Sequence, residues 1–189
     1  MKVPGPQGEV AIETRETFVF PNQMRHELGA PESGSRAVRY FDGSEGWEST
    51  PRGVREMNDV SKQFWRAEVF RNTFNLLRAE GEFSVQFEKR EKVGESEAEV
   101  LLIRKESESV RLFVEPASGR LLKKAYRGIG LGGPADIEQT YSDYREVGGV
   151  WVPFRVEITQ NGFPILKMAL TEIKFDTGVN PAELAKKPE

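Results

Sequence analysis

The chain has 189 residues, of which 38% are hydrophobic and 30% are charged, and its formal net charge is −3. This composition is typical of a folded globular chain and excludes a disordered one, and the interspersed acidic and basic residues exclude the basic footprint of a nucleic-acid-binding protein. The sequence has no run of about 18 apolar residues, which excludes a transmembrane helix, and it has no cysteine, which excludes disulfides and thiolate chemistry.

The chain begins with a pattern of short strands and turns. Apolar and polar residues alternate over residues 10–20, which is the period of a strand with one buried face. The Pro-Asn pair that follows favours a turn, because proline fixes its own φ and lacks the N–H that a sheet ladder needs. Alternation resumes over residues 23–28, and this second predicted strand contains Arg25 and His26. Residues 36–41 predict a third strand, and DGSEGW after them predicts a tight turn.

One long amphipathic helix is predicted next, over residues 61–81. Ser61 or Asp59 is the expected N-cap, because both side chains can accept a hydrogen bond from the first helical turn. Gly81 is the expected end, because glycine adopts the left-handed conformation at little cost. The apolar stripe of this helix consists of Phe64, Ala67, Phe70, Phe74 and Leu77, widened by Trp65, Val69 and Leu76.

The rest of the chain again predicts strands joined by tight turns. The pairs Gly148-Gly149 and Asn161-Gly162 are strong signals for two-residue hairpins, because both central residues of such a turn have positive φ. Residues 176–189 predict a short terminal turn of helix followed by a loop.

Consecutive strands with tight connections indicate an antiparallel sheet. A flat sheet of about ten strands would be unusual, since such sheets curl or close. We therefore expect a mostly β protein of the α+β class, in which a half-open antiparallel β-barrel of about ten strands carries one main amphipathic helix over its concave face. The pattern shows no boundary within residues 1–189, which predicts a single domain.

The residues that could take part in catalysis form no recognisable catalytic motif in this sequence. His26 is the only histidine, so a catalytic triad or a histidine metal site would have to use it, and no motif surrounds it. The glycine-rich segment 128–134 is followed by strand-like alternation rather than by a helix, which favours a hairpin loop over a phosphate-binding loop. We therefore expect no enzymatic activity, no metal site and no cofactor. No spacing singles out a catalytic pair among the carboxylates Glu13, Glu16, Asp42, Asp136 and Asp143.

Aromatic residues are numerous for a chain with so little helix. It contains 12 Phe, 3 Trp and 4 Tyr, most of which we attribute to core packing. A curved sheet under a helix can either pack these side chains together or hold them apart around an apolar ligand, and the sequence leaves both versions open. If the cavity is open, the predicted ligand-binding residues are Phe18, Phe20, Met24, Trp47, Phe64, Phe70, Phe74 and Phe87.

Five segments, in order, resemble the bacterial lipoprotein carrier family of LolA, LolB and their relatives. FVFPNQMRHEL resembles the family's strand, proline turn and arginine-containing strand, and YFDGSEGWE resembles its DG…W hairpin. EPASGRLLKKAY and YSDYREVGGVWVPFRVEI are similar to two later hairpin segments, and VNPAELAKKP is similar to the closing motif, with Ala185 where phenylalanine is usual. Together the segments span nearly the whole chain.

The resemblance implies an unclosed antiparallel barrel with a helical lid and a cavity that accepts lipid acyl chains, in a periplasmic protein whose leader is absent from this chain. It also implies a role for Arg25 as a lid latch, whose donors hold backbone carbonyls of the lid; the alternative is an ordinary solvated arginine. Expected partners are an apolar ligand or an acyl chain, and lipoproteins or other envelope proteins.

A second interpretation uses the same fold differently. The chain would be a non-catalytic accessory or interaction domain of a longer exported protein, for example a periplasmic zinc peptidase, and its own side chains would fill the core. The sequence does not decide between this interpretation and ligand binding.

Overall fold

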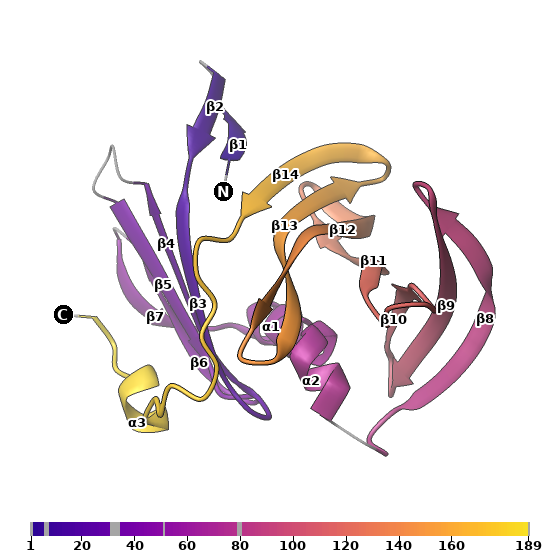
Figure 1. Ribbon diagram of the computed structural model, residues 1–189. Coiled ribbons are helices and arrows are strands. Elements are labelled where there is room, and N and C mark those ends of the chain that lie inside the picture. The colour runs from indigo at the N-terminus through magenta and orange to yellow at the C-terminus, as the bar shows by residue number, and fades with distance from the viewer. Residues whose placement is uncertain (1, 6–7, 31–34, 51, 79–80, 189) are drawn as a thin grey trace. The chain divides into compact units, whose positions relative to one another are not determined.

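The computed structural model describes residues 2–5, 8–30, 35–50, 52–78 and 81–188 (Figure 1). The chain divides into two compact units. The first comprises residue 1 with residues 9–79 and 176–189, and the second comprises residues 2–8 and 80–175. In agreement with the sequence, the strands are antiparallel and the chain is mostly β, with one main helix.

The first unit contains a five-stranded antiparallel sheet in which neighbouring strands follow chain order. Its strands are β3 (Glu13–Val19), β4 (Gln23–Ala30), β5 (Ser35–Phe41), β6 (Gly46–Thr50) and β7 (Gly53–Glu56). The predicted turn between β3 and β4 is confirmed, because Val19 pairs with Gln23 across it. The turn between β5 and β6 is held by Asp42, whose Oδ1 accepts hydrogen bonds from the backbone N–H groups of Ser44 and Glu45 at 2.8 Å each.

The predicted long helix is two helices, α1 (Asp59–Arg71) and α2 (Thr73–Arg78). The predicted N-cap is wrong: Asn58 caps α1, and its Oδ1 accepts a hydrogen bond from the Ser61 N–H at 2.9 Å. Between the helices Asn72 has extended backbone, with ψ of 123°. Its Oδ1 accepts from the N–H of Phe74 at 3.0 Å, so the chain starts a second helix there instead of continuing the first.

One face of the five-stranded sheet packs against α1. The register places Phe18, Met24 and Phe41 side by side on this face, since directly paired residues share a face. Trp65 and Val69, one helical turn apart, pack against them. Of the predicted apolar stripe, Ala67 and the flanking Trp65 and Val69 are buried, whereas Phe64 is not. Phe64 remains 36% exposed.

The second sheet has nine antiparallel strands in the order β2-β1-β14-β13-β12-β11-β10-β9-β8. The described residues thus hold fourteen strands in two sheets, where the sequence predicted about ten in one. The bounds are β1 (Lys2–Gly5), β2 (Gly8–Ala11), β8 (Ser84–Val93), β9 (Ser96–Lys105), β10 (Glu108–Val114), β11 (Leu121–Gly130), β12 (Gly133–Val147), β13 (Val150–Gln160) and β14 (Phe163–Ala169).

Both predicted two-residue hairpins of this sheet are confirmed. Gly148 and Gly149, with φ of 56° and 82°, join β12 to β13. Asn161 and Gly162, with φ of 49° and 81°, join β13 to β14. Positive φ at both central residues gives the turn the twist of the strands that it connects.

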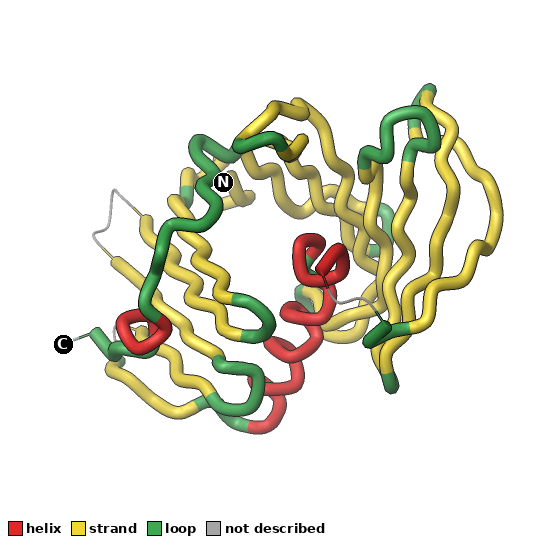
Figure 2. Tube along the Cα trace, turned by 60° about the horizontal axis from the view of Figure 1, so that its bottom comes forward, coloured by secondary structure: helices red, strands yellow, loops and turns green. Residues whose placement is uncertain are grey.

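The predicted terminal turn of helix is α3 (Pro181–Leu184). Asn180 caps it, since its Oδ1 accepts a hydrogen bond from the Ala182 N–H at 2.9 Å. Leu184 is 4% exposed and packs on the five-stranded sheet with Val38, Tyr40 and Trp47. Figures 1 and 2 place α3 and α1 on opposite sides of this sheet.

Candidate functional site

The predicted ligand-binding residues do not form one cluster in the first unit. Phe18 and Met24 lie in the core under α1, where Met24 is 4% exposed. Phe20 lies next to Phe18, with ring centroids 4.8 Å apart, and the Arg78 guanidinium lies 4.5 Å from its ring centroid. Phe64 packs edge-on against Trp65. The described side chains therefore fill the space between α1 and the five-stranded sheet.

Phe70, Phe74 and Trp47 lie away from that core cluster. Phe70 on α1 and Phe74 on α2 are half-buried. Trp47 faces the other side of the sheet and belongs to the cluster under α3. Its indole Nε1 donates a hydrogen bond to the Ala185 carbonyl at 3.0 Å. This contact uses a backbone group, so the sequence carries no signal for it.

Arg25 binds backbone carbonyls, and those carbonyls belong to the C-terminal segment rather than to α1. Its Nη1 donates to the Leu184 carbonyl at 2.9 Å and to the Lys186 carbonyl at 2.8 Å. The last carbonyls of a helix have no partner within the helix, so a guanidinium at this end satisfies them and interacts favourably with the helix dipole. Together with Trp47, Arg25 thus holds three consecutive carbonyls at the end of α3.

Glu27 fixes the orientation of this arginine. Arg25 Nε donates to Glu27 Oε1 at 2.7 Å, and Arg36 binds the other carboxylate oxygen. Burial opposes ionisation of Glu27, but the hydrogen bonds from the two arginines outweigh it and hold the pKa of this carboxyl below its usual value. Glu27 therefore stays charged and keeps one side of the Arg25 guanidinium in place.

His26 lies on the opposite face of β4, toward α1. Its ring packs against Trp65 with centroids 5.9 Å apart, and Nε2 shares a hydrogen bond with the Thr14 hydroxyl at 2.8 Å. Burial, assisted by the nearby Arg39 charge, lowers the pKa of His26 to about 4. The imidazole is therefore neutral near pH 7, in a packed and structural setting.

Phe87 lies in the second unit, where it belongs to an apolar face of the nine-stranded sheet. Phe87 pairs with Leu101, which pairs with Leu112 of β10. In the next row on the same face, Val85 pairs with Ile103, and Ile103 pairs with Val110. The edge residues Val85 and Phe87 are 57% and 53% exposed, while Ile103 and Val110 are 3% and 1% exposed. We call these two rows the β8–β10 apolar face.

Sequence reasoning named only Phe87 in this face. The signal for the other members was present, because Leu101 and Ile103 have the same parity in β9, as do Val110 and Leu112 in β10. Buried residues also lie at the intervening positions, such as Val100 at 0% exposure. Alternation alone therefore did not single out one face.

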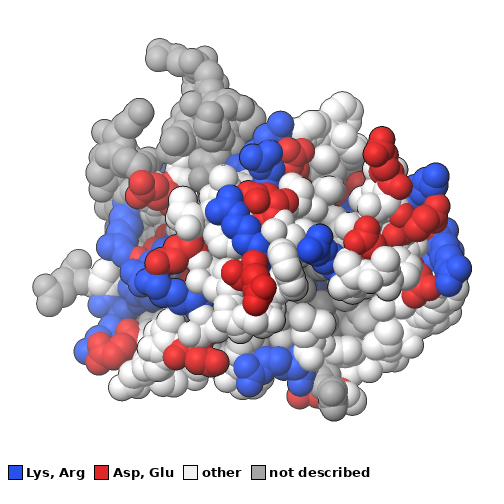
Figure 3. Space-filling model, viewed as in Figure 1, with Lys and Arg blue, Asp and Glu red and all other residues white. Residues whose placement is uncertain are grey.

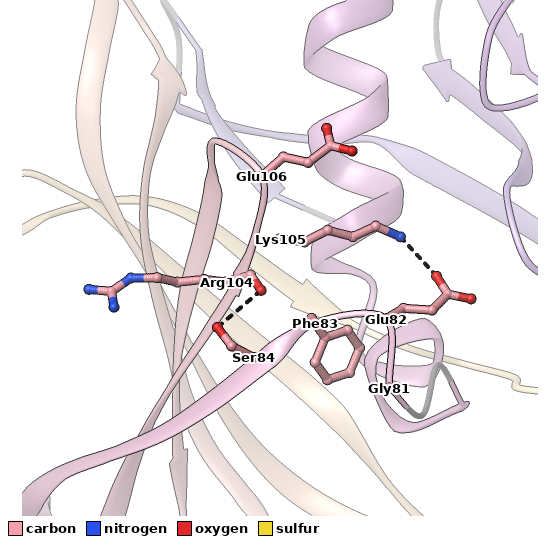
Figure 4. Close-up of a pocket in the computed structure, with 7 residues that line it drawn as sticks. All are labelled: Gly81, Glu82, Phe83, Ser84, Arg104, Lys105 and Glu106. Carbon is pink, nitrogen blue, oxygen red and sulfur yellow. Dashed lines mark hydrogen bonds and ion pairs between the residues drawn. The ribbon is translucent and has the colours of Figure 1, made fainter.

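A pocket of about 480 Å³ lies where β8 begins, beside the turn between β9 and β10 (Figure 4). Lys105 Nζ contacts Glu82 Oε2 at 2.8 Å across it, next to Phe83. Arg104 and Glu106 also line the pocket. Its charged lining differs from the apolar cavity that the sequence predicted.

The charged groups that the structure describes show no arrangement suited to a metal ion. Within the described ranges, no group of three or more His, Cys, Asp or Glu residues is placed to hold a metal ion. Acidic and basic side chains are intermixed on the face seen in Figure 3. None of the helices in the described part of the chain combines the length and hydropathy that crossing a bilayer requires.

These features define a class: mostly antiparallel β-sheet with one main helix and an apolar sheet face. No protein-family model and no curated protein matches the chain. Solved structures do match it over nearly its whole length. A LolA superfamily protein from Nitrosomonas europaea is 14% identical, with a TM-score of 0.65 over 98% of this chain and 86% of that one. The chain therefore has the LolA-like fold.

Two further structures agree. An outer membrane lipoprotein-sorting protein domain from Vibrio parahaemolyticus is 12% identical, with a TM-score of 0.63 over 97% of this chain and 85% of that chain. A DUF1329 family protein from Desulfovibrio piger is 12% identical, with a TM-score of 0.60 over 93% of this chain and 81% of that chain. At these identities the likeness establishes the fold alone.

Proposed function

We propose that the chain is a periplasmic, carrier-like binding module for lipid acyl chains or another apolar ligand, without catalytic activity. The observation that carries the proposal is the β8–β10 apolar face, found in a fold shared with a lipoprotein-sorting domain. The proposal includes one domain over residues 1–189, a half-open barrel with α1 toward its concave side, and lipoproteins or envelope proteins as partners.

An acyl chain could bury apolar surface against the exposed end of the β8–β10 apolar face. Val85 and Phe87 are each more than half exposed, and they continue rows that run into buried Ile103 and Val110. Each methylene removed from water contributes about 0.8 kcal/mol, so a chain laid along these rows gains affinity with its length. No charged residue belongs to the two rows from β8 to β10.

The alternative is an accessory domain with a self-filled core, for example attached to a periplasmic zinc peptidase. Met24, Phe41 and Met57 are each 4% exposed or less, and together with Trp65 they pack the interface between α1 and the five-stranded sheet. This packing favours a filled interior in the first unit. Under the carrier proposal the ligand therefore lies on the second sheet rather than between α1 and the first.

Native mass spectrometry of protein from a bacterial host, with a fluorescent fatty-acid titration, tests the proposal. We expect co-purified lipid or saturable uptake, weakened about tenfold by the double variant Val85→Ser, Phe87→Ser, because two apolar contacts are lost. Val150→Ser is the matched control, since Val150 is also exposed on the nine-stranded sheet but lies at the β12–β13 turn. Absence of uptake by the unaltered chain would favour the accessory-domain alternative.

A further inference from the structure

Two uncharged turns meet at one end of the nine-stranded sheet. Residues 128–135 and 158–166 contain no Asp, Glu, Lys or Arg, in a chain that is 30% charged. The first segment includes the β11–β12 turn, and the second includes the β13–β14 turn. Their apolar side chains point into solvent: Leu131 is 76% exposed, Phe163 is 73% exposed and Ile129 is 56% exposed. We call these three residues the apolar tip.

Hydrogen bonds lock the two turns together. Gln160 Nε2 donates to the Leu131 carbonyl, and the Leu131 N–H donates to Gln160 Oε1, both at 2.8 Å. Asn161 likewise exchanges two hydrogen bonds with the backbone of Asp136, at 2.8 and 2.9 Å. Gly130 permits this approach, because a Cβ there would lie 2.5 Å from Gln160 Oε1. The backbone that carries the exposed side chains of the apolar tip is therefore held in place by hydrogen bonds between the two turns.

The same contacts lower the cost of taking the tip out of water. A backbone N–H or C=O without a partner is expensive in an apolar medium. Both backbone groups of Leu131, the most exposed residue of the tip, are satisfied by the Gln160 amide. Pro134 and Pro164 flank the turns and have no N–H to satisfy. No charge in either segment has to be desolvated.

We propose that the apolar tip docks this protein on a lipid surface by inserting Leu131 and Phe163 at the bilayer interface. A stable protein partner would bury about 800 Å² on each side, well beyond what three side chains at turns supply. A fluid lipid surface needs no matching shape and accepts turn residues whose backbone groups are already paired. The proposal does not rest on acyl binding by the β8–β10 apolar face, which uses different residues.

The lack of cysteine makes a site-specific test possible. Leu131→Cys and, separately, Val150→Cys carry an environment-sensitive dye, and each is mixed with vesicles of phosphatidylcholine, alone or with phosphatidylglycerol. Val150 lies at the opposite end of β13 and is 42% exposed, so it reports adsorption that does not involve the tip. We expect a blue shift, and quenching by lipids spin-labelled on the acyl chain, at position 131 only and with both vesicle types.

A flotation assay with the unlabelled chain completes the test. The double variant Leu131→Ser, Phe163→Ser should bind vesicles about tenfold more weakly, while Val150→Ser binds as the unaltered chain does. Equal dye responses at both positions, binding only to anionic vesicles, or no binding at all would overturn the proposal. So would self-association that the double variant abolishes in the absence of vesicle binding, which would assign the tip to a second copy of the chain.

Discussion

Arg25 donates hydrogen bonds to the carbonyl of Leu184, the last residue of α3, and to the Lys186 carbonyl just beyond the helix. Replacing it with leucine removes the side-chain donor to the Leu184 and Lys186 carbonyls and one of the two arginines that bind Glu27. We expect Arg25→Leu to lower the free energy of unfolding by about 1–3 kcal/mol, the usual cost of stranding such groups. Denaturant titration followed by fluorescence measures this, since Trp47 lies in the affected cluster. If the arginine also latches a ligand cavity, fatty-acid uptake changes as well.

Arg36→Leu is the matched control for this experiment. Arg36 binds the same carboxylate, Glu27, but its side chain is 63% exposed and its described hydrogen bond goes to Glu27 rather than to α3. Its loss should cost much less, because exposed ion pairs contribute about 0–1 kcal/mol. Equal losses for the two variants would mean that the α3 carbonyls do not account for the effect. Unchanged stability and uptake in Arg25→Leu would refute the latch.

Because of His26, the free energy of unfolding should vary with pH in the mildly acidic range. Its pKa is about 4 in the folded chain, against 6.5 for the ordinary side chain, so the unfolded chain binds the proton more readily. The stability from the neutral imidazole is therefore full above pH 6.5 and is lost as pH falls toward 4. The loss amounts to about 3 kcal/mol at most. Urea titrations across this range measure it, and His26→Asn should flatten the slope. An unchanged slope in the variant would contradict this assignment.

At the scale of elements, the tight turns could be predicted from the sequence, but the face of the helix that packs on the sheet could not. The pairs Gly148-Gly149 and Asn161-Gly162 fix their turns by themselves, so the sequence sufficed. The two predicted N-caps, Asp59 and Ser61, missed the observed Asn58 by one and three residues, because the side chains at positions 58, 59 and 61 can all cap. The sequence placed Phe64 in the stripe and Trp65 at its edge, and only the sheet decides which of these two adjacent residues packs.

At the scale of the whole chain, sequence patterns could not predict two features: the division of the strands into two sheets, and the contact between Arg25 and the C-terminal segment. Nothing in the period of alternation tells which strands share a sheet. Arg25 and the Leu184 carbonyl are 159 positions apart, and the accepting group is one that every residue carries. The LolA-like resemblance predicted that Arg25 binds carbonyls, but it pointed to the helical lid rather than to the C-terminal segment.

The packing of α3 on the first sheet allows a test of whether the two units unfold as one domain. Leu184→Ala creates a cavity beside Trp47, which should cost about 2–5 kcal/mol. If residues 1–189 unfold together, hydrogen exchange should accelerate equally at Phe41 in the first unit and at Val100 in the second, because both open only through global unfolding. The reciprocal variant Val152→Ala, at a site that is 1% exposed in the second unit, should accelerate the same two amides. Acceleration confined to the unit that carries each substitution would instead mean two independently unfolding domains.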